Sequence, residues 1–443
     1  MQKLQNRSLK FKIITLGCPL NQSDSDSFRD RLLESGFNET ADIADIYIIN
    51  SCVVTQKAAR NSRKEARKAK KLNPNSIVCL MGCYGEIEKE VLKNNIPEID
   101  HVVGTKDRNY LLEELTETTS LVFEKTAKYD ELGITHRSIK SRPVVKIQEG
   151  CNNKCSYCIV TIARGQPRSR KYENIKKQVT QFLENGYKEI ILAGTNMGVY
   201  GIDLQTDINL ATLLDRLASL PYKNFRLRLS SLEPMEVTEE VLQVIKKHNK
   251  ICNNLYLPLQ SGSDNILKRM NRNYTTDDFA QLVNRARTLM PDISIVTDLI
   301  SGFPGEQRKD HKRTMEFVSE LRLSKVHVFT YSPRPYTLAY NFKDQVRPDI
   351  KKRRTDEIKQ LDLQLTKKFH EDNLKSIKRI LIEQINNIGE HLSIKGFSDN
   401  YCLLECTVGE NDNIYNNEFI YTIGLEAHEW GIKGQVLLPK EVK

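Results

Sequence analysis

Three cysteines, Cys151, Cys155 and Cys158, follow an apolar run in the segment VKIQEGCNNKCSYCIV. This spacing gathers three thiols, which are soft metal ligands, into one short loop. Structural zinc normally takes four ligands, so a distant His or Cys would have to complete a zinc site. An iron–sulfur cluster held by three thiolates would instead keep one iron open to an outside ligand. An open metal position of this kind is where catalysis takes place.

Three further cysteines each follow an apolar, β-branched run in the first hundred residues. The runs FKIITLGC, DIYIINSC and SIVCLMGC end at Cys18, Cys52 and Cys83, and their composition predicts three strands. The gaps of roughly 30 residues suit βαβ crossovers, with helices in SDSFRDRLLESG and TQKAARNSRKEARKAKKLNP. Because loops at the carboxyl ends of parallel strands form one crevice, we expect these three thiols to converge.

A second series of apolar runs predicts a partial parallel barrel. A polar or glycine-bearing segment follows each run, and helical patterns lie between the runs. Six successive β/α units are typical of a parallel barrel or part of one. The active site of such a barrel lies at the carboxyl ends of its strands, which is where the thiol loop at 151–158 would lie. The predicted strands are 144–148, 189–194, 225–231, 254–260, 294–301 and 325–332.

The C-terminal region differs in its sequence pattern from the rest of the chain. After a charged helical stretch at 348–376, short β-like runs alternate with Asn, Gly and Asp clusters. About five short strands predict a small antiparallel β-barrel, a fold that often binds oligonucleotides. The polar stretch at 117–140 is the predicted linker between the first two regions. We therefore predict an α/β protein with an N-terminal open α/β sheet domain, a central partial (β/α)6 barrel and a small C-terminal antiparallel β-barrel.

Length and composition fit a multidomain cytoplasmic protein. A chain of 443 residues exceeds the size of one hydrophobic core. The sequence contains neither an apolar stretch long enough to span a membrane nor a secretory leader, so we expect a cytoplasmic protein without a membrane partner. In that reducing compartment the ten cysteines are expected to be metal ligands, catalytic groups or core residues rather than disulfide partners.

The net charge of +10 is concentrated in basic runs at 57–71, 163–171 and 351–354. Clustered positive charge attracts polyanions through their phosphates, whereas a single run is as often a solvated helix face. Because the runs flank the cysteine motifs, we expect RNA or DNA as a partner. Two roles are possible for the arginines of the second run, contact with RNA phosphate or simple solvation, and these arginines are Arg164, Arg168 and Arg170.

The CxxxCxxC pattern at 151–158, with Tyr157 before the last thiol and a strand before the first, resembles the signature of radical S-adenosylmethionine enzymes. The resemblance implies a [4Fe-4S] cluster on Cys151, Cys155 and Cys158. S-adenosylmethionine would bind the open iron through its amino and carboxylate groups. One electron would then cleave the sulfonium to give methionine and a 5′-deoxyadenosyl radical.

The segments TLGCPLNQSDSD, NSCVVTQKAARNSRK and MGCYGE resemble the cluster-binding region of the methylthiotransferases. This radical S-adenosylmethionine family has a C-terminal RNA-binding barrel called TRAM, and the resemblance covers essentially the whole chain. It implies a second [4Fe-4S] cluster, whose open iron would carry the sulfur, on Cys18, Cys52 and Cys83. The implied domains are the N-terminal cluster-binding domain, the radical core and TRAM, at residues 10–117, 137–367 and 372–440.

Other residues are candidates for cofactor binding or for packing. By the same resemblance, the amino group of S-adenosylmethionine would lie at Gly194, Thr195 and Asn196. Four rim positions on later strands are candidate cofactor contacts that could instead serve as turn or cap residues: Ser230, Ser231, Gln260 and Asp298. The remaining cysteines are expected to pack in the core, as free cysteines often do: Cys79, Cys252, Cys402 and Cys406.

The stretches KIQEGCNNKCSYCIV, AGTNMGVYG, RLRLSSLEP and HVFTYSPR most resemble the branch of the family that acts on N6-threonylcarbamoyladenosine at position 37 of tRNA, next to the anticodon. The resemblance implies that the radical removes hydrogen from C2 of the adenine, where a methylthio group is then placed. The implied partners are tRNA, a protein electron donor and a sulfur donor. Alternatives are the same chemistry on N6-isopentenyladenosine or on a ribosomal protein aspartate, and, from another class, a non-catalytic iron–sulfur RNA-binding protein.

Overall fold

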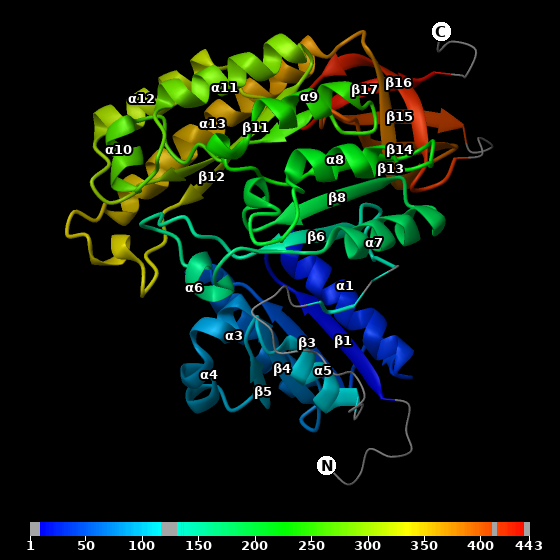
Figure 1. Cartoon of the computed structure of the whole chain (residues 1–443), viewed down its shortest axis with the longest axis vertical. Helices are drawn as coiled ribbons and strands as arrows, with labels where there is room; N and C mark the ends of the chain where they lie inside the picture. The colour runs from blue at the N-terminus through cyan, green and yellow to red at the C-terminus, as the bar shows by residue number, and fades with distance from the viewer. Residues whose placement is uncertain (1–8, 117–130, 134, 136, 410–413, 438–443) are drawn as a thin grey trace.

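The computed structural model describes residues 9–116, 131–133, 135, 137–409 and 414–437. Figure 1 shows three regions in chain order, with the N-terminal sheet (blue to cyan) on one side of the central strands and the C-terminal barrel (orange to red) on the other. This architecture confirms the predicted α/β fold class. Among the described residues, no helix combines the length and the apolar character that crossing a bilayer requires.

The N-terminal region is a parallel sheet with helices on both faces, as predicted. Its strands lie in the order β2-β1-β3-β4-β5. Small side chains of α2, such as Ala59 and Ala66, pack against one face, and Phe28 and Leu32 of α1 cover the other. The elements are β1 Lys10–Thr15, α1 Pro19–Glu34, β2 Asn38–Glu39, β3 Ile46–Ser51, α2 Gln56–Leu72, β4 Ile77–Gly82, α3 Cys83–Ile87, α4 Lys89–Asn95, β5 His101–Val103 and α5 Arg108–Thr116.

Only part of the predicted linker at 117–140 is described. Residues 117–130, 134 and 136, like the predicted ends of the first and last domains at 117 and 440, lie outside the described residues. The described end of the linker packs on α1, where the Ser138 hydroxyl donates to Asp26 Oδ2 at 2.7 Å.

The central region has six parallel strands, each near its predicted place, and one further two-residue strand, β7, which pairs with β6 in the antiparallel sense. Hydrogen bonds near Leu227 and Ile251 join the sheet β7-β6-β8-β9 to the sheet β10-β11-β12. β10 is shorter than the predicted 254–260 because Pro258 has no amide hydrogen to donate. The strands are β6 Val144–Glu149, β7 Arg168–Ser169, β8 Glu189–Gly194, β9 Arg226–Leu229, β10 Asn254–Tyr256, β11 Ser294–Ser301 and β12 Lys325–Thr330.

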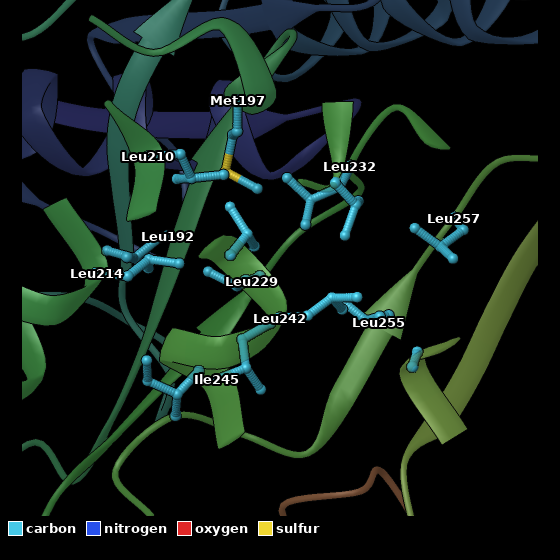
Figure 2. Packing of buried hydrophobic residues seen from close by; sticks show 14 of the residues in the cluster. Leu192, Met197, Leu210, Leu214, Leu229, Leu232, Leu242, Ile245, Leu255 and Leu257 are labelled. Atoms are coloured by element: carbon cyan, nitrogen blue, oxygen red, sulfur yellow. The ribbon is translucent and has the colours of Figure 1, made fainter. Parts of the chain in front are cut away.

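Helices cover the outside of these strands. The intervening helices are α6 Val160–Arg164, α7 Tyr172–Glu184, η1 Met197–Val199, α8 Leu210–Ala218, η2 Pro234–Glu236, α9 Glu239–Lys247, α10 Asp264–Arg269, α11 Thr276–Leu289, α12 Arg308–Glu320, η3 Leu338–Asn341 and α13 Pro348–Asp372. Figure 2 shows how leucines of β8, β9 and β10 meet Leu214 of α8 and Leu242 of α9 in one buried cluster. This apolar core fixes the strands whose ends form the candidate site.

The C-terminal region is a closed five-stranded barrel in the order β13-β14-β15-β17-β16. The barrel was predicted to be antiparallel, but β15 and β17 pair in parallel. The reason is topological, since strand directions cannot alternate all the way around a closed ring with an odd number of strands. The strands are β13 Ile377–Ile388, β14 His391–Phe397, β15 Leu403–Gly409, β16 Phe419–Ala427 and β17 Ile432–Val436.

A buried carboxylate fastens this barrel to the central region. Glu189, at the start of β8, accepts from Arg226 Nε at 2.6 Å and from Arg228 Nε at 2.5 Å. The same guanidinium groups donate to the backbone carbonyls of Phe397 and Ser398 in the barrel. Burial alone would raise the pKa of Glu189, but the two arginines outweigh burial and lower it well below the usual range. The carboxylate is therefore charged at neutral pH.

Replacing Glu189 by Ala should lower the free energy of unfolding by about 3–5 kcal/mol, because Arg226 and Arg228 would remain buried without their counter-charge. Urea denaturation followed by circular dichroism measures the change. The matched control is Glu418→Ala at the same junction, where the half-exposed pair with Lys188 is worth less than about 1 kcal/mol. Equal losses in the two variants would contradict the prediction.

Candidate active site

A cavity opens at the carboxyl ends of the central strands, with an empty volume of about 1300 Å³ including its mouth. We call it the rim cavity. Cys151, Cys155 and Cys158 line it, and Val54 and Thr55 of the N-terminal region close one side. The rim cavity therefore connects the barrel thiols with the segment that directly follows Cys52.

Most of the predicted cofactor contacts lie on this cavity. Thr195 and Asn196 follow β8, and Ser231 follows β9. The remaining two lining residues among the candidates are Gln260 and Asp298. Gly194 and Ser230 lie outside the lining; the Ser230 hydroxyl instead points at Met197 Sδ, 3.7 Å away. Contact of any of these seven residues with a cofactor stays a prediction.

The loop that holds the barrel thiols is tightly folded. The Cys158 amide donates to the Cys155 carbonyl at 3.1 Å, and Arg272 Nη1 donates to Cys155 Sγ at 3.1 Å. Burial, together with the neighbouring thiols, raises the pKa of Cys151 to about 11 and that of Cys158 to about 12. Burial and neighbouring thiols thus disfavour the anionic forms of Cys151 and Cys158, a penalty that a bound cation would remove.

The N-terminal thiols follow three adjacent parallel strands. β1, β3 and β4 end at Thr15, Ser51 and Gly82, so the three cysteines come one to three residues later, with Cys83 opening α3. Burial raises the pKa of Cys83 to about 11; Arg164 opposes this effect, while Cys18 and Cys52 add to it. These mutual effects place the three thiols within electrostatic reach of one another.

Two glycines allow this close approach. Gly17 has φ +133°, and a Cβ there would lie 3.1 Å from the Cys52 Cβ. Gly82 has φ +97°, and a Cβ there would lie 2.6 Å from Asn50 Oδ1. Side chains at either position would be strained and would push the thiol loops apart. The Gly-Cys pairs of the sequence are thus explained by packing between the loops.

The donors of both trios suit an iron–sulfur cluster. Within the described residues, no three His, Cys, Asp or Glu side chains are arranged to hold one metal ion. Three cysteine thiolates are the donor set of a cluster that keeps one iron open. The other four cysteines are buried, as core residues should be: Cys79, Cys252, Cys402 and Cys406.

Two orphaned acceptors lie beside the barrel thiols. Asn196 Nδ2 donates to Glu236 Oε1 at 2.9 Å, while Asn196 Oδ1 and Glu236 Oε2 are buried and make no hydrogen bond. Burial raises the pKa of Glu236 to about 7. Unpaired buried acceptors call for a donor, and the ammonium group of S-adenosylmethionine has suitable chemistry. Glu236 was missed from the sequence, although it stands in the polar segment SSLEPME.

A second acid pairs with a buried arginine at the same rim. Glu233 forms an ion pair with Arg272, whose other nitrogen reaches Cys155. Across the cavity, the Tyr256 hydroxyl donates to Asp298 Oδ1 at 2.5 Å, and burial raises the pKa of Asp298 to about 6. Arg272 carried no signal in the sequence because it lies outside the strand-end segments.

The prediction that Arg164 meets RNA phosphate or solvent is wrong. Its side chain is 2% exposed, and it donates to Glu149 Oε1 at 2.5 Å and to Asn21 Oδ1 at 3.1 Å. Glu149 also binds Arg108 at 3.0 Å and Lys146 at 3.1 Å. Burial would raise the pKa of Glu149, but these cations outweigh it and hold the pKa well below the usual range. Arg164 thus joins the barrel to the first turn of α1, directly after Cys18.

Two of the three basic runs are largely structural. Arg170 is buried in a pair with Glu131, so the same prediction is wrong for it, and Arg168 is partly buried 4.0 Å from Glu149. In the run 351–354, Lys351 and Arg354 are also buried. The run 57–71 differs, because its helix α2 turns a continuous basic stripe outward. The exposed residues of the stripe are Lys57, Arg60, Lys64, Arg67, Lys68 and Lys71.

Comparisons with known proteins agree with this geometry. The Radical SAM superfamily matches residues 145–318, and the uncharacterized protein family UPF0004 matches residues 10–104. The chain is 36% identical to threonylcarbamoyladenosine tRNA methylthiotransferase MtaB of Bacillus subtilis, over 87% of this chain and 88% of that protein. It is 32% identical to tRNA-2-methylthio-N(6)-dimethylallyladenosine synthase of Clostridium botulinum, over 96% of both chains.

A solved structure shares the fold. The radical S-adenosylmethionine methyltransferase TsrM of Kitasatospora setae, with tryptophan substrate and a cofactor analogue bound, matches 75% of each chain with a TM-score of 0.57. At 14% identity this likeness shows the arrangement of the elements alone.

Proposed function

The chain belongs to the radical S-adenosylmethionine methylthiotransferase family, and from this premise we propose that it converts N6-threonylcarbamoyladenosine at position 37 of tRNA to its 2-methylthio derivative. The protein is a tRNA methylthiotransferase whose cofactors are S-adenosylmethionine and [4Fe-4S] clusters. The observation that supports the choice of base is the 36% identity to a relative named for that nucleoside. The second candidate is N6-isopentenyladenosine, because other relatives are named for dimethylallyladenosine.

We assign the two thiol trios to two clusters, of which the first lies on the rim cavity and the second lies behind the segment of Val54 and Thr55 that closes one side of it. Cys151, Cys155 and Cys158 would hold the first, in the radical core at 137–367; the second would be held, in the domain at 10–117, by Cys18, Cys52 and Cys83. When bound, the first cluster supplies the electron that cleaves S-adenosylmethionine to a 5′-deoxyadenosyl radical. Asn196 and Glu236 would accept hydrogen bonds from the cofactor's ammonium group, and Thr195, Ser231, Gln260 and Asp298 would line the rest of its site.

Charge on the N-terminal region supports an RNA partner. The basic stripe of α2 begins at Lys57, two residues after Thr55 on the rim cavity, and runs along one face of a 17-residue helix. Such a helix is about 25 Å long, long enough to follow several phosphates. A base beside the anticodon is single-stranded and can enter the cavity at low cost. We further propose that the barrel at 372–440 is the RNA-binding domain. The remaining proposed partners are a protein electron donor and a sulfur donor.

The nucleosides of tRNA test the choice of base. In a strain that lacks this gene and any redundant enzyme, 2-methylthio-N6-threonylcarbamoyladenosine should disappear, and its unmethylthiolated precursor should accumulate. Liquid chromatography with mass spectrometry of digested tRNA measures both. Loss of the 2-methylthio form of isopentenyladenosine instead would favour the second candidate and contradict the proposal.

Replacing single thiols should separate the two trios. Cys155→Ala should abolish reductive formation of 5′-deoxyadenosine, because the first cluster loses a ligand. Cys52→Ala should leave 5′-deoxyadenosine formation intact and stop methylthiolation of the tRNA. Cys79→Ala is the matched control, since that thiol is buried inside β4 and both activities should persist. Full methylthiolation by Cys52→Ala would refute the assignment of the second trio.

Removing part of the basic stripe should weaken tRNA binding and its dependence on salt. The triple change Lys57→Ala, Arg60→Ala and Lys64→Ala should lower the slope of log affinity against log salt by about 3 if each residue meets one phosphate. Filter binding at several salt concentrations measures the slope. The control removes three exposed cations from α12, on the outside of the barrel, namely Arg308, Lys309 and Lys312. The same loss of slope in the control would contradict a specific role for α2.

A further inference from the structure

Arg334 is a buried arginine whose guanidinium makes no hydrogen bond or ion pair with the described residues. Its side chain is 6% exposed, and its Nε is buried and unsatisfied. The other deeply buried arginines differ, since Arg164 and Arg226 each bind a carboxylate. A buried guanidinium without a counter-charge is unfavourable. Its position therefore indicates an anion that the chain itself does not provide.

Arg334 lies on a strap, residues 331–341, that connects the segments of both thiol trios. At one end, Gln56, which stands four residues after Cys52, donates its amide hydrogen to Ser332 Oγ at 3.3 Å. At the other end, the Ala339 amide donates to the carbonyl of Ser156, within the loop of the barrel thiols, at 2.8 Å. The Thr337 hydroxyl donates to the Arg334 carbonyl at 2.7 Å. These bonds hold the arginine beside the N-terminal trio.

The ionisable groups that act most strongly on the guanidinium all belong to the N-terminal region. Glu88 acts on Arg334 most strongly, followed by Tyr84 and Cys52, and no ion pair joins any of them to it. Arg63, also nearby, is already engaged by the Tyr84 hydroxyl. Because Ser332 and Val54 line the rim cavity, a small ligand can approach this place from the cavity. A phosphodiester backbone is too bulky to reach a side chain buried to this degree.

We propose that Arg334 forms an anion subsite beside Cys52 that binds the sulfur to be transferred, as hydrosulfide or a comparable small sulfur anion. The inference rests on the proposed function, since a methylthiotransferase needs such a ligand next to its second trio of thiols. Arg334 would donate hydrogen bonds to the anion and keep it ionised, and it would place the anion on the cavity side of the trio. The proposed step is binding alone, without a covalent change.

The test measures sulfide binding without tRNA. The full-length protein carries Cys151→Ala, Cys155→Ala and Cys158→Ala, so that the N-terminal trio alone is loaded with iron. Sodium sulfide is titrated, and the change in the electron paramagnetic resonance spectrum of the reduced cluster is followed. Arg334→Met should raise the sulfide concentration for half of the change at least about tenfold, the effect of losing a charge-assisted hydrogen bond. Arg334→Lys should raise it less, because it keeps the charge but loses the guanidinium fork.

Arg63→Met is the matched control, because it removes the same charge near the same thiols from a side chain that already has a partner. It should shift the half-change less than about twofold. The inference would be overturned if Arg334→Met needed the same sulfide concentration as the unsubstituted arginine for half of the spectral change. It would also be overturned if Arg63→Met raised that concentration as much as Arg334→Met does. If Arg334→Met does not retain iron, Arg334→Lys provides the test: the same sulfide concentration for half of the change as with Arg334 in place would overturn the inference. Since no tRNA is present, the result is independent of which base the enzyme modifies.

Discussion

The candidate site depends on one buried carboxylate, that of Glu149 at the end of β6. It binds Arg108 of the N-terminal region, Lys146 of its own strand and Arg164, which follows the barrel thiols. Asp24 of α1 pairs with Arg108 and Lys146 from the other side. Because these charges lie out of water, removing Glu149 would leave more buried cations than Asp24 alone can balance. The two thiol regions are thereby held in one fixed relation, and the rim cavity between them is a consequence of that fixed junction.

A second buried glutamate paired with arginines lies on the opposite side of the central strands. Glu189 at the start of β8 gathers Arg226 and Arg228, whose remaining nitrogens bind backbone carbonyls of the C-terminal barrel. The central strands thus carry one buried glutamate for each neighbouring domain. A hydrophobic junction could slide, whereas hydrogen-bonded charges define a single register, and this is the use for which buried ion pairs are best attested. The positions of the N-terminal and C-terminal regions on the central strands are therefore set by two short networks.

Local patterns predicted the strands and the thiol loop at 151–158, because hydrophobic periodicity and close cysteine spacing are properties of neighbouring residues. The distant thiols of the N-terminal trio were brought together in the prediction by the rule that parallel strands end at one edge of a sheet. Local patterns failed where the partner comes from far along the chain. Arg164 and Arg170 resemble a basic surface run, and nothing nearby in sequence shows that Glu149 and Glu131 will bury them. Glu236 and Arg334 were missed for a related reason: what marks them is an unsatisfied buried atom, which exists only after folding. The parallel pairing of β15 and β17 was missed as well, because it follows from closing a barrel with an odd number of strands and no single strand shows it in its sequence.

The size and the lining of the rim cavity bear on how the two trios can cooperate. The volume of the rim cavity without its open mouth, about 330 Å³, lies at the lower end of the 300–1,000 Å³ typical of a site for one small ligand. One end presents the barrel thiols with the unpaired acceptors of Asn196 and Glu236, and the other end lies beside the segment after Cys52. Under the proposed assignment of the two trios, a nucleoside between these ends would face a radical source on one side and a sulfur source on the other, and the junction at Glu149 would fix the distance between the two.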